Sequence, residues 1–203
     1  MPDSRNCMTS EQDRGEARCN QVLDAAADCF RQRGFHGASM AEVARAAGMS
    51  VGHIYHYFAN KEAIISAIVE RDVAEILALL ESLQSEDDLL QALVREAGNN
   101  LEEASCGYDD ALQIEVLAEA TRNPKVLAMV RDGDRLARER LAETITKGRA
   151  MRGLPPLADL EARTEIVIAL FEGLSCRNIR NPGVPIEAIA KLLRSTLQHL
   201  LET

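Results

Sequence analysis

Residues 39–62 read SMAEVARAAGMSVGHIYHYFANKE. The chain of 203 residues has three Tyr, four Phe and no Trp, yet three of these seven rings fall in this stretch, at Tyr55, Tyr57 and Phe58. Two of the four histidines stand beside them, at positions 53 and 56. Because rings are scarce everywhere else, their concentration here indicates a segment with a special role.

The pattern within this stretch predicts two short helices joined by a sharp turn. Ser39 followed three residues later by Glu42 has the form of a capping box, which starts a helix at Met40. Gly48 can take the positive φ that the turn requires. Ser50 can cap the next helix, which we expect to run to about Phe58. The apolar residues expected to face the protein interior are Val43, Ala44, Ala47, Met49, Ile54 and Phe58.

Two short helices with a turn of about three residues containing glycine are typical of a DNA-binding helix-turn-helix. A preceding helix, from Asn20 to Arg33 and ended by Gly34, completes a three-helix domain. The side chains left facing outward on the third helix are at positions 51, 52, 53, 56 and 57. A major groove admits such a helix, and its N-terminal residues reach base edges. The alternative is a compact three-helix core with exposed histidines and no DNA partner.

The rest of the chain also has helical periodicity. After a fourth helix capped by Asn60, we expect helices over Asp87–Glu103, Tyr108–Arg122, Pro124–Met151, Leu157–Asn178 and Pro185–Leu201. No segment shows a competing strand pattern, so the predicted class is all-α. Residues 1–17 lack apolar periodicity and are predicted to form a flexible leader.

Composition and charge narrow the function only partly. The net charge of −9 argues against a nucleic-acid partner, but residues 1–60 hold six Arg and seven acids and are nearly neutral. No apolar run is long enough to cross a membrane, so we expect a soluble cytoplasmic protein. The five cysteines include no Cys-x-x-Cys pair, which indicates reduced thiols, although Cys106 or Cys176 could sense redox state.

With these features in view, residues 20–69 resemble the DNA-binding domain of the tetracycline-repressor (TetR) family of bacterial regulators. The resemblance rests on FRQRGF followed by SMAEVARAAGMSVGHIYHYFANKEAI, a long motif matched almost throughout. It implies a DNA-binding domain over residues 18–64 and a larger helical ligand-binding and dimerisation domain over residues 65–203, about nine helices in all. The second region resembles the family mainly in architecture, with an acidic-Gly-Leu step at Glu172-Gly173-Leu174.

The family motif assigns expected roles to the matching residues. Val51, His53 and His56 would face the bases, while Gly52 would allow close approach of the backbone. The expected phosphate contacts are Ser39, Tyr55, Tyr57 and Lys61, which position the protein without reading sequence. Position 53 is frequently Thr in the family, so His53 leaves the base preference open.

The resemblance also implies a ligand-responsive regulator that acts as a repressor and binds a palindromic operator as a homodimer through its last two helices. A small, mainly apolar effector would bind the C-terminal domain and release the DNA by swinging the fourth helix. The side chains expected to line its pocket are Leu101, Tyr108, Leu112, Glu115, Leu117, Val130 and Phe171. An open alternative is that the last two helices only cover the core of their own monomer.

Other chemistries have little support in the sequence. His53 and His56 stand three residues apart, but no third metal ligand is evident, so neither metal nor cofactor is expected. Only His199 lies beyond the first domain, and no nucleophile or phosphate-loop motif occurs, so an enzyme is not expected. The remaining alternative is a small-molecule-binding or sensor protein of the same fold without repressor activity. An eroded third helix would favour that alternative, and the third helix here is intact.

Overall fold

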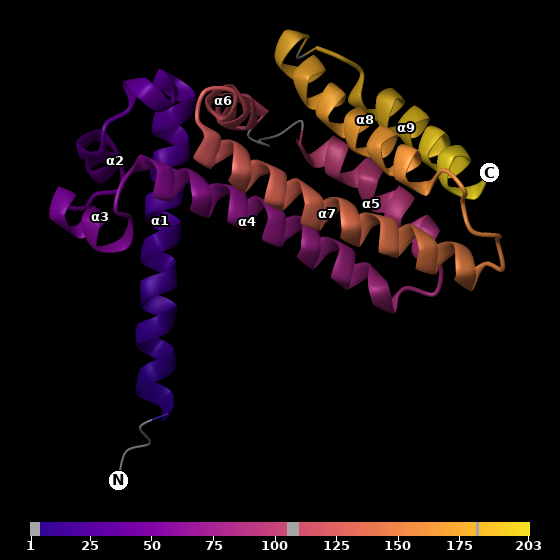
Figure 1. Cartoon of the computed structure of the whole chain (residues 1–203), viewed down its shortest axis with the longest axis horizontal. Helices are drawn as coiled ribbons and strands as arrows, with labels where there is room; N and C mark the ends of the chain where they lie inside the picture. The colour runs from indigo at the N-terminus through magenta and orange to yellow at the C-terminus, as the bar shows by residue number, and fades with distance from the viewer. Residues whose placement is uncertain (1–4, 105–109, 182) are drawn as a thin grey trace. The chain divides into compact units, whose positions relative to one another are not determined.

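The computed structural model describes residues 5–104, 110–181 and 183–203, and within these ranges it confirms the all-α class. The described residues form nine α-helices and one short 3-10 helix, and no strand (Figure 1). Their bounds are α1 Arg5–Gly37, α2 Met40–Ala46, α3 Val51–Tyr57, α4 Lys61–Ser82, η1 Leu83–Ser85, α5 Leu89–Ala104, α6 Asp110–Ala120, α7 Pro124–Met151, α8 Leu160–Arg180 and α9 Ile186–Glu202.

The chain divides into two compact units, and the division differs from the predicted boundary between residues 64 and 65. The first unit comprises Met1–Arg71 and Ala111–Val130, and the second comprises Asp72–Asp110 and Arg131–Thr203. The fourth helix does cross the division, as its sequence suggests. The difference is that most of α6 and the first turns of α7 belong to the first unit.

The core of the first unit explains why α6 belongs to it. The helices α1 to α4 bury an apolar cluster that includes Val22, Ala26, Phe30, Val43, Ile54, Phe58, Ile64 and Ile68. Four residues from α6 and the start of α7 are buried in the same cluster, namely Leu112, Val116, Ala120 and Val126. Apolar surface must be buried against another element. The apolar face of α6 is therefore buried in the first unit.

Helix α1 begins much earlier than the periodicity predicts. It is helical from Arg5, whereas we expected helix only from Asn20 and a leader without regular structure over residues 1–17. This segment is rich in polar residues that accept a helix without needing to bury a face. In Figure 1 the N-terminal part of α1 extends away from α2 and α3, which lie beside its C-terminal half.

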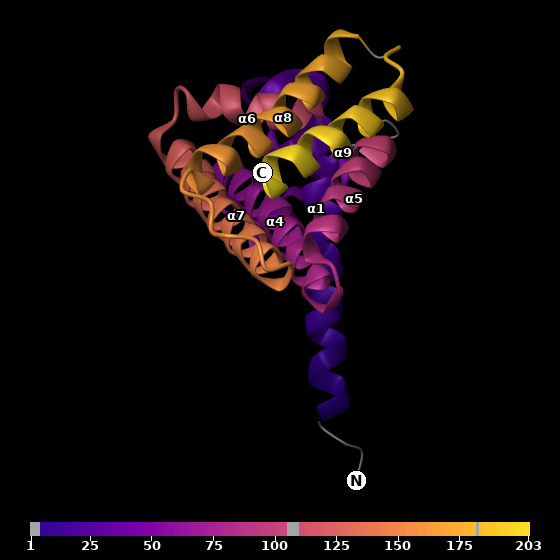
Figure 2. The ribbon, with the colours of Figure 1, turned by 90° about the vertical axis from the view of Figure 1, so that its right-hand side faces the viewer.

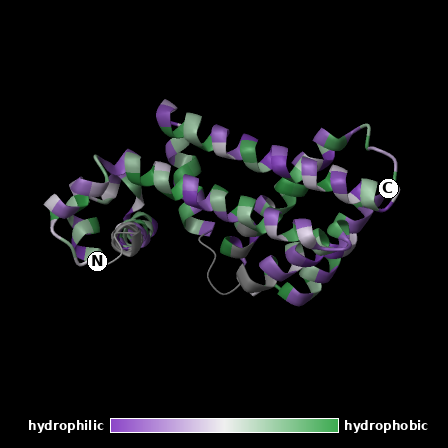
Figure 3. Cartoon of the chain, turned by 90° about the horizontal axis from the view of Figure 1, so that it is seen from below, coloured by the Kyte–Doolittle hydropathy of each residue, from purple (hydrophilic) through white to green (hydrophobic). Residues whose placement is uncertain are grey.

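The second unit is built around α5, α7, α8 and α9. Its buried apolar residues are Leu90, Ala97, Ile145, Val167, Leu193, Leu197 and Leu201. Helix α9 lies between α5 and α8 (Figure 2). Hydrophilic and hydrophobic segments alternate along the helices that Figure 3 shows from the side, as expected where one face is buried. No helix among the described residues is long and apolar enough to cross a membrane.

Three arginines hold the C-terminal end of α9 in the second unit. Arg149, only 3% exposed, donates to Pro155 O at 2.8 and 2.9 Å and to Leu201 O. Arg163 donates to Leu200 O at 2.6 Å, and Arg152 pairs with Glu202. Cationic side chains are favourable at a helix C-terminus, where backbone carbonyls lack partners. The last turn of α9 is thereby anchored to α7 and α8.

Candidate DNA-binding site

The entry into α2 confirms the predicted capping box. The Ser39 side chain accepts a hydrogen bond from Glu42 N at 3.2 Å, and the Glu42 carboxylate accepts one from Ser39 N at 2.9 Å. These bonds from Ser39, with a smaller contribution from Arg33, lower the pKa of the Glu42 carboxyl below its ordinary value. Two backbone donors at the helix start are satisfied in this way, which fixes where α2 begins.

The turn after α2 is also as predicted. Gly48 has a φ of +64°, which a side-chain-bearing residue rarely adopts. Its N–H bonds to Arg45 O, and the next N–H, on Met49, bonds to Ala44 O at 2.9 Å. This pair of bonds is a Schellman motif, which ends a helix and redirects the chain. Gln21 of α1 donates to Ala47 O at 2.7 Å and holds the turn from the other side.

Helix α3 divides into an inner and an outer face. Its cap forms as expected, with the Ser50 side chain accepting from His53 N at 3.2 Å. Ile54 and Phe58 are buried in the core of the first unit, as predicted. Because these two anchors lie one turn apart, the opposite face of α3 is fixed in direction.

The predicted base-facing residues all lie on the exposed face. Val51, Gly52, His53, Tyr55 and His56 are exposed. No atom lies within 4 Å of a Cβ built at Gly52, and its φ is not positive, so the fold does not require glycine there. The polar side chains at positions 53, 55 and 56 accept or donate no hydrogen bond within the described residues. They are therefore available to a partner.

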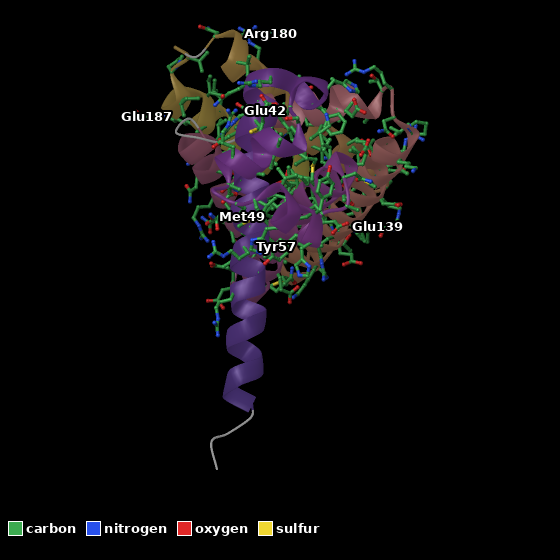
Figure 4. The ribbon with its side chains drawn as sticks, turned by 90° about the vertical axis from the view of Figure 1, so that its left-hand side faces the viewer. Glu42, Met49, Tyr57, Glu139, Arg180 and Glu187 are labelled. Atoms are coloured by element: carbon green, nitrogen blue, oxygen red, sulfur yellow. The ribbon has the colours of Figure 1, made fainter. Side chains whose placement is uncertain are left out.

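Tyr57 is half-buried and packs against the core of the first unit. Its ring centroid lies 5.3 Å from the ring of His53 and 5.2 Å from the ring of His56. Figure 4 looks onto this side of the domain, with Met49 of the turn and Tyr57 of α3 labelled. The ring contacts restrict the rotamers of both histidines without using their nitrogen atoms.

Lys61, expected at a phosphate, already has two partners in the protein. Its ammonium donates to Phe35 O at 2.6 Å and to Ala38 O at 2.8 Å, and it lies 4.6 Å from the centroid of the Phe35 ring. An ammonium has three donors, so one remains for a phosphate. Ser39, the other expected phosphate ligand at this edge, has its hydroxyl in the capping box. Both phosphate contacts remain predictions.

Arg45 is a candidate that the sequence analysis did not single out. It is exposed on α2 and forms no ion pair among the described residues, whereas Arg33 pairs with Glu42 and Arg71 with Asp24. The first helix of a helix-turn-helix crosses the DNA backbone, where a free guanidinium is useful. Its signal in the sequence was weak, because Glu42 stands three residues before it at the spacing of an ion pair; in the structure Glu42 pairs with Arg33 instead.

The structure divides the predicted pocket residues between the two units. Leu112 is buried in the first core, Val130 packs against that core, and Leu117 is exposed. Glu115 accepts a hydrogen bond from Phe35 N at 2.6 Å. Leu101 and Phe171 pack against the second core, and Tyr108 lies outside the described residues. The pocket therefore stays a prediction, and of this set Leu101 and Phe171 pack at the core of the second unit.

The remaining reactive groups show no second site. Among the described residues no three of His, Cys, Asp and Glu are grouped in a way that could hold a metal ion. Burial raises the pKa of the Cys19 and Cys29 thiols, which reduces their reactivity. Cys176 is half-buried, and Cys106 lies outside the described residues.

A capped helix, a glycine turn and a second helix with one anchored and one exposed face define a helix-turn-helix DNA-binding protein. Comparison with known proteins agrees. Residues 22–68 match the sequence model of the bacterial regulatory proteins of the tetR family, and residues 109–202 match that of the BetI-type transcriptional repressor C-terminal region. The chain belongs to the tetR family and is a DNA-binding transcriptional regulator.

Relatives and solved structures extend over most of the chain. It is 28% identical to the HTH-type transcriptional regulator UidR of Escherichia coli K12 over 171 residues, 82% of this chain and 84% of UidR. The structure of Salmonella enterica GusR superposes with a TM-score of 0.75 at 28% identity, covering 92% of this chain and 96% of GusR. The complex of SmeT, a Stenotrophomonas maltophilia repressor, with triclosan has a TM-score of 0.77 at 21% identity and covers 90% of each chain.

Proposed function

We propose that this regulator is a homodimeric repressor that binds a palindromic operator and is released when a small, mainly apolar molecule binds its second unit. The observation that carries the proposal is the exposed face of α3, whose polar groups the fold leaves without hydrogen bonds. Acting on DNA places the protein in the cytoplasm. The C-terminal match to BetI-type repressors favours repression over activation.

Selection of duplexes from a randomised pool tests the DNA-binding part. The full chain should enrich an inverted repeat, because the two copies of α3 in a symmetric dimer present themselves to two half-sites. Half-sites should be separated by about one helical turn, roughly 34–36 Å, or a multiple of it. Enrichment of a single, non-repeated site would contradict the dimeric reading, and no enrichment would contradict operator binding.

Support for the dimer comes from the surface of α8. Four small or apolar residues form an exposed stripe at helical spacing along it, namely Ala162, Ile166, Ala169 and Gly173. A Cβ built at Gly173 would meet no atom within 4 Å, so the monomer does not need glycine there. On α9, Leu192 is 69% exposed. Small residues allow two helices to approach closely, and a second copy of the chain would bury this stripe in an isologous contact.

The same helices also serve their own monomer. Leu193 and Leu197 of α9 are buried in the core of the second unit. One face of α9 therefore covers the core of its own monomer, as in the alternative that the sequence left open. The proposed dimer uses the other face of α9, together with the exposed stripe of α8.

The proposed effector site lies within the second unit. Half-buried apolar side chains gather around its core, including Leu93, Leu101, Leu141, Leu170, Phe171 and Leu174. Such a lining suits an apolar molecule. By analogy, the SmeT structure holds triclosan in the same fold. A screen of apolar compounds should find ligands that raise the melting temperature and weaken operator binding, and Phe171→Ala should reduce both effects.

A further inference from the structure

Residues 34–38 follow a kink in α1 at Gly34 and lead to the N-cap of α2, and α6 binds them through a backbone hydrogen bond. Gly34 has a φ of +72°, which turns the chain so that the Phe35 side chain is buried against Phe30. The turn also directs Phe35 N at Glu115 of α6, whose Oε1 accepts the hydrogen bond at 2.6 Å. A bond from a backbone N–H to a carboxylate is about twice as strong as one between neutral groups.

A second carboxylate of α6 binds the next residue of the segment. Glu119 Oε2 lies 2.9 Å from His36 Nε2, with the Glu119 side chain 3% exposed and that of His36 71% exposed. Oε2 is buried and accepts no hydrogen bond of good geometry, so the contact is a close approach between a carboxylate and an imidazole, which is an ion pair only when the imidazole is protonated. The guanidinium near Oε2 is that of Arg122, whose Nη2 is 3.8 Å away and whose side chain is largely exposed. A buried carboxylate depends strongly on its nearest cation.

Glu119 is also bonded to the start of α7. Its Oε1 accepts from Asn123 Nδ2 at 3.1 Å. Asn123 in turn caps α7, because its Oδ1 accepts from Lys125 N at 3.1 Å and its carbonyl from Leu127 N at 2.9 Å. The first turn of α7 and residues 34–38 are therefore joined through one buried carboxylate. Beyond Val130 the same helix α7 continues into the second unit.

The other side of the segment is held by α4. Lys61 donates to Phe35 O and Ala38 O, as described above. The connection into α2 is thus held by one cation from α4 and two carboxylates from α6. Ser39, the N-cap of α2, follows directly after residues 34–38. Loss of the contacts from α4 or from α6 would therefore change the orientation of α2 and α3.

We propose that Glu115 and Glu119 of α6 are positioning residues for the helix-turn-helix, and that Asn123 couples them to the first turn of α7. Together they form a connection to the DNA-binding helices that is separate from α4. That ligand binding acts on the DNA-binding helices through this connection rests on the proposed function. A ligand acts through it only as far as the ligand prefers one arrangement of α7 to another.

Amide hydrogen exchange on the full chain without DNA tests whether Glu115 and Glu119 restrain residues 34–38. In Glu115→Ala and Glu119→Gln, exchange in residues 34–40 should accelerate by about tenfold or more, as expected when a hydrogen bond to a charged group is lost. Exchange in residues 41–49 should accelerate as well, while α9 stays unchanged. Gln113→Ala, an exposed change on the same helix, is the matched control. Unchanged exchange in residues 34–49 of both variants would overturn the proposal.

Operator affinity of the folded protein tests positioning as distinct from stability. With the duplex selected from the random pool, well below the melting temperature, we expect His36→Gln and Glu119→Gln each to bind about tenfold more weakly. The slope of affinity against salt should stay unchanged, because no phosphate contact is lost. The double variant should bind no more weakly than either single one, since the pair acts as a unit.

The exchange and affinity measurements distinguish a failure of the positioning role from a failure of the proposed function. Affinities within twofold of wild type, or losses that simply add in the double variant, would overturn the positioning role. If the wild-type chain selects no duplex, the proposed function fails instead, and exchange in residues 41–49 decides the positioning role alone.

Discussion

Two regions of the first unit, the outer face of α3 and residues 34–38, are both rich in rings and histidine, yet the fold treats them in opposite ways. The side chains of His53, Tyr55 and His56 of α3 form no hydrogen bond within the described residues. By contrast, the backbone of Phe35 and the side chain of His36 are bound by groups from α4 and α6. Side chains that the fold leaves unused are available to a partner, whereas those it uses can transmit a change of shape.

The proposed dimer surface gives the largest expected effect, because it is another face whose side chains the fold leaves exposed. If the proposed dimer forms, the pair Ile166→Glu and Leu192→Glu should convert it to a monomer, as measured by analytical ultracentrifugation. Operator affinity should fall by about 10²-fold or more, since binding to two half-sites is no longer linked. Leu136→Glu, at another exposed leucine of the second unit, is the control. A monomer with unchanged affinity would contradict this assignment.

Lys61 is relevant to both regions, because its ammonium donates to two carbonyls of residues 34–38 and is also predicted to contact a phosphate. Lys61→Ala should lower the free energy of unfolding by about 1–3 kcal/mol, since two carbonyls lose a charged donor. It should also reduce the salt slope of DNA binding by about one. Arg45→Ala should reduce the slope similarly but leave the melting temperature unchanged. If Lys61→Ala changes stability but not the slope, its role is confined to the fold.

A substitution at Gly34 tests whether the conformation of residues 34–38 depends on the positive φ of that glycine. Gly34→Ala should lower the free energy of unfolding by about 1–3 kcal/mol, because a φ of +72° with a ψ of 163° is a backbone conformation essentially restricted to glycine. A Cβ there would also lie 3.0 Å from Glu115 Oε1. Urea unfolding measures the change. As control, Gly52→Ala on the outer face of α3 should cause no loss of stability, because the space around it is open. Equal losses at the two glycines would remove the distinction between the regions.

The smallest expected effect is the pH dependence of the stability that Glu42 contributes. The hydrogen bonds from Ser39 lower the pKa of Glu42, so its charged form is favoured in the folded state. Such a group adds stability above its ordinary pKa of about 4.3, and this contribution is lost as the pH falls through the lowered value. Melting temperatures of wild type and Glu42→Gln should therefore differ at pH 6 and converge at pH 3. A constant difference across this range would show that the carboxylate does not matter.

The α2–α3 region could be predicted from the sequence because its structure is determined locally. The capping box at Ser39, the positive φ of Gly48 and the buried pair Ile54 and Phe58 each follow from residues within four positions of one another. The outward direction of His53 and His56 then follows from the helical period. Base contacts remain predictions, since no local rule states what a histidine reads.

The contacts of residues 34–38 could not be predicted, because they join residues far apart in the sequence. Glu115 was expected in a ligand pocket, and on periodicity alone an acid on α6 is equally suited to a pocket, to solvent or to a backbone N–H. Its partner Phe35 is 80 residues away. Likewise, the apolar face of α6 did not reveal that it packs in the first unit. Local patterns give the faces of helices but not which faces meet.

The central claim is that the outer face of α3 binds DNA and contributes little to the fold. The double substitution His53→Ala and His56→Ala tests it most directly, with melting temperature and selection from a randomised duplex pool measured on the same preparation. We expect a melting temperature close to that of wild type, because only ring contacts with Tyr57 are lost, together with a different or absent enriched sequence. An unchanged enriched sequence bound with unchanged affinity would contradict it.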